Sequence, residues 1–174
     1  MLFTDEVSFY RQPTQAWLWH SMGRAQPRLP YSHRSNTLMR VIGVLDAWSG
    51  RVQAWDYGRA TATRLGKCWA SAAANYPQAK KIYLVMDNWP VHFHKDALGP
   101  LLRDPRVQVL PLPTYAPWLN NIEKLWRWVK ARVTHAHPWS DDFTAFKEEI
   151  RTELRRSELP ELKRYCGLVR LFSQ

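Results

Sequence analysis

Long hydrophobic runs are missing from this chain. Apolar residues make up 45% of its 174 residues, yet no run approaches the ~18 residues of a membrane-spanning helix. The first ten residues, MLFTDEVSFY, lack the basic region and the apolar stretch of a secretion signal. These absences argue against a membrane protein and a secreted one. We therefore expect a cytoplasmic protein that has no membrane partner.

Cysteine is also scarce. Cys68 and Cys166 are the two cysteines, and they form no Cys-x-x-Cys pair. A disulfide scaffold and a four-cysteine zinc site are excluded, and a reducing compartment fits. Two His-x-His pairs begin at His92 and His135, but no third-ligand pattern accompanies either. Zinc is therefore not expected.

Acidic residues are absent between Glu6 and Asp46, and the whole chain carries a net charge of +10. Five arginines lie in that acid-free stretch: Arg11, Arg24, Arg28, Arg34 and Arg40. Because phosphate binding is largely electrostatic, a nucleic-acid partner is the first hypothesis. A basic protein without such a partner is the alternative.

The hydrophobic pattern predicts three strands followed by alternating helices and strands. The expected strands are Leu2–Phe9, Leu38–Trp48, Arg51–Tyr57, Lys81–Met86 and Val107–Leu110. The expected helices are Thr61–Tyr76, Phe93–Arg103, Trp118–Thr134, one capped by Asp141 or Asp142 and running to about Arg156, and a last one near Pro160. This order indicates an α/β fold. A mixed five-stranded sheet, antiparallel in its first three strands, would be flanked by helices.

Three acidic residues stand where a purely structural residue is not expected. Asp5 interrupts an apolar strand, although aspartate is depleted in strands. Asp87 follows a buried strand, at the end where open α/β sheets bind ligands. Glu123 lies beside the apolar stripe of the helix 118–134. These positions would bring three carboxylates together if the strands are neighbours and the helix packs on them.

Clustered carboxylates repel one another unless a cation neutralises them. Oxygen-only ligands suit Mg²⁺ or Mn²⁺, and two such ions support phosphodiester chemistry. Separate turn or cap roles remain the alternative, above all for Asp87. Asp46 is a reserve carboxylate, for which a turn role before Ser49 is favoured. Strand alternation points Glu6 away from Asp5, which indicates a structural or indirect role for Glu6.

Tryptophan is abundant, with ten residues in the chain. We expect Trp48, Trp69 and Trp126 to pack in the core. Trp89 and Trp118 flank the acidic positions and are candidates for stacking on unpaired bases. Packing against the protein is the alternative for both.

The segments around the three acids resemble the catalytic blocks of the DDE transposases. These segments are TDE at 4–6, LVMDNWPVH at 84–92 and LPTYAPWLNNIEKLWRWVK at 112–130. The nearest branch is the mariner superfamily, in particular the bacterial insertion-sequence six-thirty group. The third block is the most specific, although Thr114, Ala116 and Asn121 depart from the family pattern.

The resemblance implies an RNase H-like fold and a metal-binding catalytic triad of Asp5, Asp87 and Glu123 that holds two Mg²⁺ or Mn²⁺ ions. It also implies that Asn88 and His92 lie beside these ligands. The implied activity is DNA strand cleavage and strand transfer in cut-and-paste transposition. The implied partners are the terminal inverted repeats, target DNA and a second copy of the chain, and the implied location is the nucleoid.

DNA contacts are expected from four basic side chains. Arg24 and Arg28 lie in the acid-free stretch, and Arg127 and Lys130 lie on the Glu123 helix. A solvated hairpin is the alternative for the first pair. Family members carry helix-turn-helix domains before the first aspartate, whereas Asp5 follows Met1 closely. We therefore expect residues 1–174 to be a single catalytic domain without that region, with an upstream reading frame as a possible source of it.

Two other functions remain open at this point. One is an inactive remnant of a transposase that only binds nucleic acid. The other is an RNase H-like nuclease of repair or RNA processing.

Overall fold

The computed structural model describes residues 1–15, 29–34, 37–114, 116–156 and 160–168. Its strands are β1 (Leu2–Tyr10), β2 (Leu38–Asp46), β3 (Val52–Asp56), β4 (Ile82–Met86) and β5 (Val107–Pro111). Its α-helices are α1 (Ala62–Ala74), α2 (Lys95–Leu101), α3 (Ile122–Val133), α4 (Phe143–Arg155) and α5 (Pro160–Tyr165). Two short 3₁₀ helices are η1 (Pro90–Phe93) and η2 (Pro117–Leu119).

The five strands form one sheet in the order β3-β2-β1-β4-β5. β1 pairs antiparallel with β2, and β2 pairs antiparallel with β3. β4 runs parallel to both of its neighbours, β1 and β5. The mixed sheet, with three antiparallel strands first, is therefore confirmed. β1 lies at the centre of the sheet, with an antiparallel neighbour on one side and a parallel neighbour on the other.

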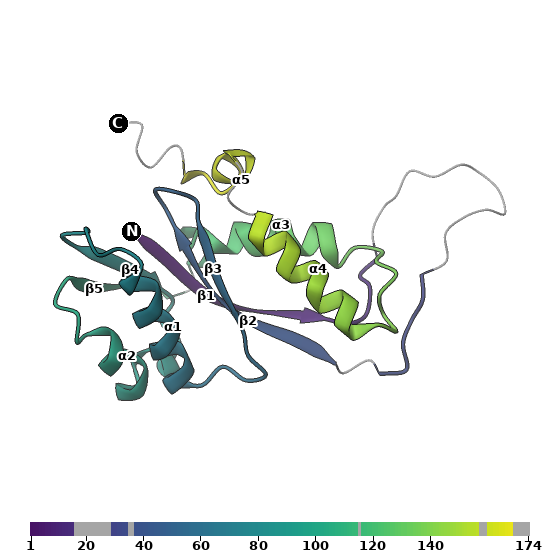
Figure 1. Ribbon diagram of the computed structural model, residues 1–174, viewed down its shortest axis with the longest axis horizontal. Helices are drawn as coiled ribbons and strands as arrows, with labels where there is room; N and C mark the ends of the chain where they lie inside the picture. Colours follow the sequence, from purple (N-terminus) through teal and green to yellow (C-terminus); the bar gives the residue numbers. More distant parts are fainter. Residues whose placement is uncertain (16–28, 35–36, 115, 157–159, 169–174) are drawn as a thin grey trace.

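Helices cover both faces of the sheet, with α3 and α4 on one side and α1 and α2 on the other (Figure 1). Alternate residues of β1 serve the two faces. Phe3, Val7 and Phe9 join the core under α3 and α4, and Leu2 joins the core under α1 and α2. Asp5 lies on the same face of β1 as Phe3, Val7 and Phe9, so a carboxylate interrupts a series of buried apolar side chains.

Local capping explains where the helices begin. Thr61 caps α1 by accepting a hydrogen bond from the backbone of Arg64, and Asp142 caps α4 in the same way. The α3 helix begins at Ile122 and not at Trp118 as expected. Pro117 opens the separate turn η2 instead, and this turn delays the helix.

The three tryptophans that were expected in the core differ in their burial. Trp69 and Trp126 are buried, as predicted, but Trp48 is 69% exposed, so its predicted core position is wrong. Asp46 explains the difference. Its carboxylate accepts hydrogen bonds from the Trp48 backbone and the Ser49 hydroxyl, and this turn carries Trp48 outward. The predicted turn role of Asp46 is thereby confirmed.

Across the described part of the chain, no helix has the length and apolar character needed to cross a bilayer.

A glycine allows the central strands and α3 to approach closely. Gly43 of β2 lies directly opposite Asp5 of β1. A Cβ atom at Gly43 would come within 2.3 Å of Cη2 of Trp126 and 3.1 Å of Cδ1 of Ile122. The Trp126 ring therefore occupies the volume that any other side chain at position 43 would fill.

We expect Gly43→Ala to destabilise the fold by about 1–3 kcal/mol, because overpacking forces a buried ring to move. Urea unfolding of both proteins measures this difference. Gly58→Ala is the matched control, since a Cβ atom there meets nothing within 4 Å. Equal stabilities of the two variants would contradict the steric argument.

Candidate active site

A cleft opens where β1 and β4 separate. Their paired positions end with Phe3 opposite Val85. Beyond that point, the side-chain amide of Asn120 donates to the carbonyl of Thr4 at 3.0 Å. The next residue, Asp5, then lies at the wall of a cleft of about 610 Å³. The end of strand pairing thus creates a crevice at the carboxyl end of β4, as open α/β sheets commonly do.

The three predicted acids line this one cleft. Asp5 comes from β1, Asp87 follows the last residue of β4, and Glu123 lies in the first turn of α3. The lining also includes Glu6 and Asn88. Among the residues that the structure describes, no three histidine, cysteine or acidic side chains are already arranged to hold a metal ion. The acidic side chains therefore line the same cleft without converging on a common metal position. Mutual repulsion between like charges accounts for this separation.

Asp5 is held by a buried tryptophan. The indole N–H of Trp126 donates to Oδ2 of Asp5 at 2.9 Å. Burial, followed by the charges of Glu6 and Glu123 and a weaker effect of Asp87, raises the pKa of Asp5 to about 7. The cleft thus carries a negative potential that a bound cation would relieve.

Asp87 is held through one of its two oxygens. Oδ1 lies 2.8 Å from Nδ1 of His92 and accepts a hydrogen bond from the backbone N–H of Trp89 at 3.1 Å. His92 is fully buried, whereas the Asp87 side chain is about half exposed. This arrangement fixes the carboxylate through Oδ1 and directs its hydrogen bonding away from Oδ2.

His92 also reaches Glu6, on the opposite side of its ring. Nε2 of His92 lies 3.2 and 3.1 Å from the two carboxylate oxygens of Glu6. Both ring nitrogens therefore face carboxylate oxygens, and the doubly protonated ring could donate to both of them. Burial lowers the pKa of His92, but hydrogen bonding to Glu6 and the charges of Glu6 and Asp87 outweigh it and raise the pKa overall. The buried His92 ring thus bridges two carboxylates, and its raised pKa favours the charged form.

Sequence reasoning indicated a structural or indirect role for Glu6 but did not identify its partner. Strand alternation does turn it away from the face that Asp5 occupies, yet His92 approaches that second face and brings Glu6 to the same cleft. The contact joins residues 86 positions apart. No local pattern announces such a pairing. The only available signal was the histidine five residues after Asp87.

Sequence reasoning missed Asn120 as a residue of the cleft. It is 4% exposed, and its amide N–H holds the backbone of Thr4 at the point where β1 leaves β4. Asn88, which was predicted to lie near the site, donates to the carbonyl of Leu112 at 2.6 Å. This bond joins the chain after β4 to the chain after β5. Both asparagines line the cleft, and each ties a different backbone segment in place.

The predicted DNA-contacting residues divide into two groups. Arg127 and Lys130 are exposed on α3, the helix that carries Glu123. Arg24 and Arg28 lie outside the described residues.

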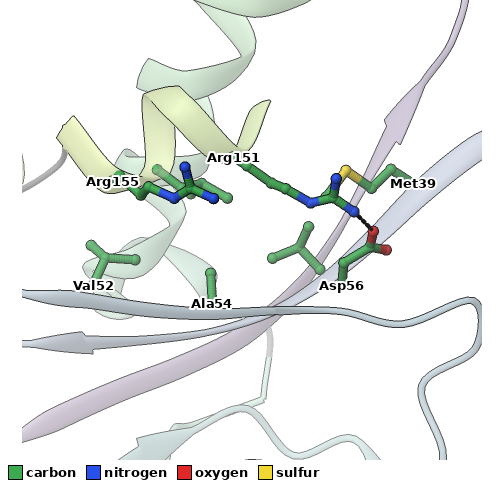
Figure 2. A pocket seen from close by; sticks show the side chains of 8 residues that line it. Met39, Val52, Ala54, Asp56, Arg151 and Arg155 are labelled. Carbon is green, nitrogen blue, oxygen red and sulfur yellow. Dashed lines mark hydrogen bonds and ion pairs between the residues drawn. The ribbon is translucent and has the colours of Figure 1, made fainter. Parts of the chain in front are cut away.

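A second hollow, of about 290 Å³, lies between α4 and the strands β2 and β3. Met39, Val52 and Ala54 line it, together with the guanidinium groups of Arg151 and Arg155 (Figure 2). Its one carboxylate, Asp56, is bound to Arg151 at 2.7 Å. The hollow therefore lacks the clustered acids that metal-dependent chemistry requires.

Residues 1–145 match the sequence family described as "DDE superfamily endonuclease". An uncharacterized 39 kDa protein of insertion element IS630 from Shigella sonnei is 24% identical over 148 residues. The match covers 85% of this chain and 43% of that protein. The chain thus spans less than half the length of this curated relative.

Solved structures of the Mos1 mariner transposase share the fold. The Mos1 paired-end complex with Mg has a TM-score of 0.64 at 15% identity, covering 95% of this chain and 53% of that chain. The Mos1 catalytic domain alone has a TM-score of 0.52 at 12% identity, covering 95% and 78%. The expected RNase H-like architecture is therefore confirmed.

The raised pKa of Asp5 predicts how its replacement changes stability. Between pH 4 and about 7 the folded chain keeps a proton on Asp5 that the unfolded chain has lost, so stability falls as pH rises through this window. Asp5→Asn cannot ionise at this position, so the variant should not show this fall in stability. At pH 8 in a chelating buffer it should raise the melting temperature by about 2–4 °C, equivalent to roughly 1 kcal/mol in a chain of this size.

Thermal melts at pH 4.5 provide the control for this comparison. This pH lies near the start of the window, where little of the stability loss has accumulated, so the gain from Asp5→Asn should be much smaller than at pH 8. A gain of the same size at both pH values would contradict the electrostatic explanation.

Proposed function

The chain belongs to the DDE superfamily endonuclease family, and we propose that it is the catalytic domain of a cut-and-paste DNA transposase of the mariner type. The observation that carries this proposal is the single cleft to which β1, β4 and α3 each bring a carboxylate. Three separate structural roles would not require three elements to meet in this way.

Asp5, Asp87 and Glu123 are the proposed ligands of Mg²⁺ or Mn²⁺, with room for two ions. Carboxylate oxygens are the ligands that these hard cations prefer. The raised pKa of Asp5 is consistent with this assignment: burial is its main cause, and the neighbouring charges of Glu6, Glu123 and Asp87 add to it. Bound cations activate the attacking oxygen and stabilise the leaving oxygen of a phosphodiester.

The reaction we propose has two displacements at phosphorus. Water attacks a phosphodiester at the end of the element, and the bond to the 3′ oxygen breaks to leave a 3′-hydroxyl. That hydroxyl then attacks a phosphodiester of the target DNA, and the target's own 3′ oxygen leaves. Neither displacement needs a covalent bond to the protein, so no serine or tyrosine nucleophile is assigned.

His92 and Asn88 are proposed as positioning residues for this reaction. His92 holds Oδ1 of Asp87, which keeps the carboxylate in one orientation. Asn88 joins the chain segments that follow β4 and β5, which fixes the wall behind Asp87. Residues that orient metal ligands in this way commonly change metal affinity or activity by about 10–100-fold when removed.

DNA is the proposed partner, namely the terminal inverted repeats and the target, with a second copy of the chain in the complex. The exposed cations Arg127 and Lys130 lie on the same helix as Glu123 and would meet phosphates beside the cleft. The solved relatives that share this fold include Mos1 complexes with transposon ends. The net charge of +10 supports the same partner.

The first test replaces one proposed metal ligand. Asp87→Asn keeps Oδ1 as an acceptor for His92 and Trp89 but removes the negative charge. Because loss of a mere orienting residue costs about 10–100-fold, we expect loss of a direct ligand to lower Mn²⁺-dependent nicking of supercoiled plasmid by at least about 100-fold. Calorimetry should show weakened Mn²⁺ binding.

Asp141→Asn is the matched control for this test, since Asp141 is exposed and does not line the cleft. It should retain wild-type nicking. Wild-type nicking by Asp87→Asn would sink the metal assignment. Wild-type protein that binds DNA but never cleaves it would favour the inactive-remnant alternative.

The second test concerns the phosphate contacts. Each lost contact should lower the slope of log affinity against log salt by ~0.9 on duplex DNA. The double variant Arg127→Ala with Lys130→Ala should therefore flatten that slope by about one to two. The control, Lys80→Ala with Lys81→Ala, removes the same charge at the opposite end of β4 from Asp87. Equal slopes would mean that net charge alone drives binding.

A further inference from the structure

Two tryptophans at the cleft remain exposed in a chain that buries others fully. Trp118 is 70% exposed and Trp89 is 40% exposed, whereas Trp69 and Trp126 are almost completely buried. The fold can bury indole rings, so the exposure of these two at the cleft needs another explanation. Aromatic rings left open beside a binding cleft commonly serve as contacts for a ligand.

Trp118 lies on the rim of the cleft, in a rigid turn. It is the middle residue of η2, and the turn begins at Pro117. Pro117 and Asn120 line the cleft on either side of it, while Trp118 itself does not. Asn120 is in turn fixed to β1 through the carbonyl of Thr4. The backbone that presents the indole is thus fixed at both ends.

Trp89 lies in the wall of the cleft and is held in place on one side. Its backbone N–H donates to Oδ1 of Asp87. Its ring meets the buried His92 edge to face, with centroids 5.2 Å apart and an interplanar angle of 81°. These contacts fix the ring and leave a fraction of it facing the cleft.

The charges around these rings indicate what kind of ligand they meet. The acidic side chains of Asp5 and Asp87 line the cleft, and the exposed cations Arg127 and Lys130 lie on the adjoining helix. Aromatic rings that present a flat face next to cations are the usual combination for unpaired nucleic acid, because every base has a face that stacks. A purely apolar partner would not need the cations.

We propose that Trp118 and Trp89 form a stacking site for unpaired nucleobases of the DNA strand that enters the cleft. Trp89 would contact a base beside the reacting phosphate, and Trp118 would contact one on the rim. This inference rests on the proposed function, because it takes DNA as the ligand. It adds that the protein distinguishes a frayed or single-stranded end from a fully paired one.

The test compares two DNAs that differ only in their bases. One is a duplex with a single-stranded 3′ overhang of about four nucleotides, and the other has abasic sites throughout that overhang. Binding is measured by fluorescence anisotropy in a chelating buffer, so that no cleavage occurs. Wild-type protein should bind the base-containing overhang at least about fivefold more tightly.

Trp118→Ala should lose most of that preference while binding the abasic DNA as the wild type does. Such non-additivity between a protein change and a DNA change reports a direct contact. Trp118→Phe should keep most of the preference, and Trp118→Leu, which is apolar but has no ring, should lose it. Trp89→Ala should lower the same ratio. If Trp118→Ala melts early, Trp118→Leu carries the comparison.

Trp48→Ala is the matched control. Trp48 is 69% exposed, but it follows β2 at the end of the sheet where β1 begins, away from the cleft. It should leave the preference unchanged. An unchanged preference in Trp118→Ala, or an equal loss in Trp48→Ala, would overturn the stacking site.

Failure of this inference can be told apart from failure of the proposed function. DNA binding without any preference for bases over abasic sites would overturn the stacking site and leave the transposase proposal standing. No binding to either DNA would count against both. Loss of self-association in Trp118→Ala, seen by sedimentation with the base preference intact, would show a protein interface and overturn the stacking site.

Discussion

The carboxylates around one cleft are the constraint on which the rest of the structure depends. Four of them, Asp5, Glu6, Asp87 and Glu123, line a crevice that opens where the pairing of β1 with β4 ends. Like charges so placed repel, and together with burial, which is the larger cause, they raise the pKa of Asp5 to about 7. Ring N–H groups of buried side chains stabilise Asp5, Glu6 and Asp87 by hydrogen bonding.

One of these donors packs against each face of β1: Trp126 comes from α3 and His92 from η1. On one face Trp126 donates to Asp5, and on the other His92 bridges Glu6 and Asp87. The space for Trp126 depends on Gly43, whose hydrogen leaves the volume that the ring fills. The raised pKa of the buried His92 favours its charged form, which would offset the negative charge of the two carboxylates where solvent cannot. Core packing and site geometry are thus the same set of contacts.

The cleft itself results from strand pairing that stops early. β1 and β4 pair only as far as Phe3 and Val85, and Asn120 then satisfies the Thr4 carbonyl. An unsatisfied carbonyl at that position would cost free energy once buried. The asparagine therefore permits the strands to separate, and the separation opens the floor on which phosphodiester chemistry would occur. The exposed tryptophans surround this opening because the two turns that bound it carry them.

The sequence by itself determined the order of strands and helices, because hydrophobic period and capping are local properties. It also placed Asp5 and Asp87 at strand positions, and Glu123 on a helix, that converge once the sheet forms. Only the tertiary structure decided that Glu6 joins His92 and that Asn120 supports Thr4. Those outcomes depend on contacts between segments far apart in the chain. Local patterns do not encode such contacts, because the free energy that selects them arises when both faces of β1 are packed.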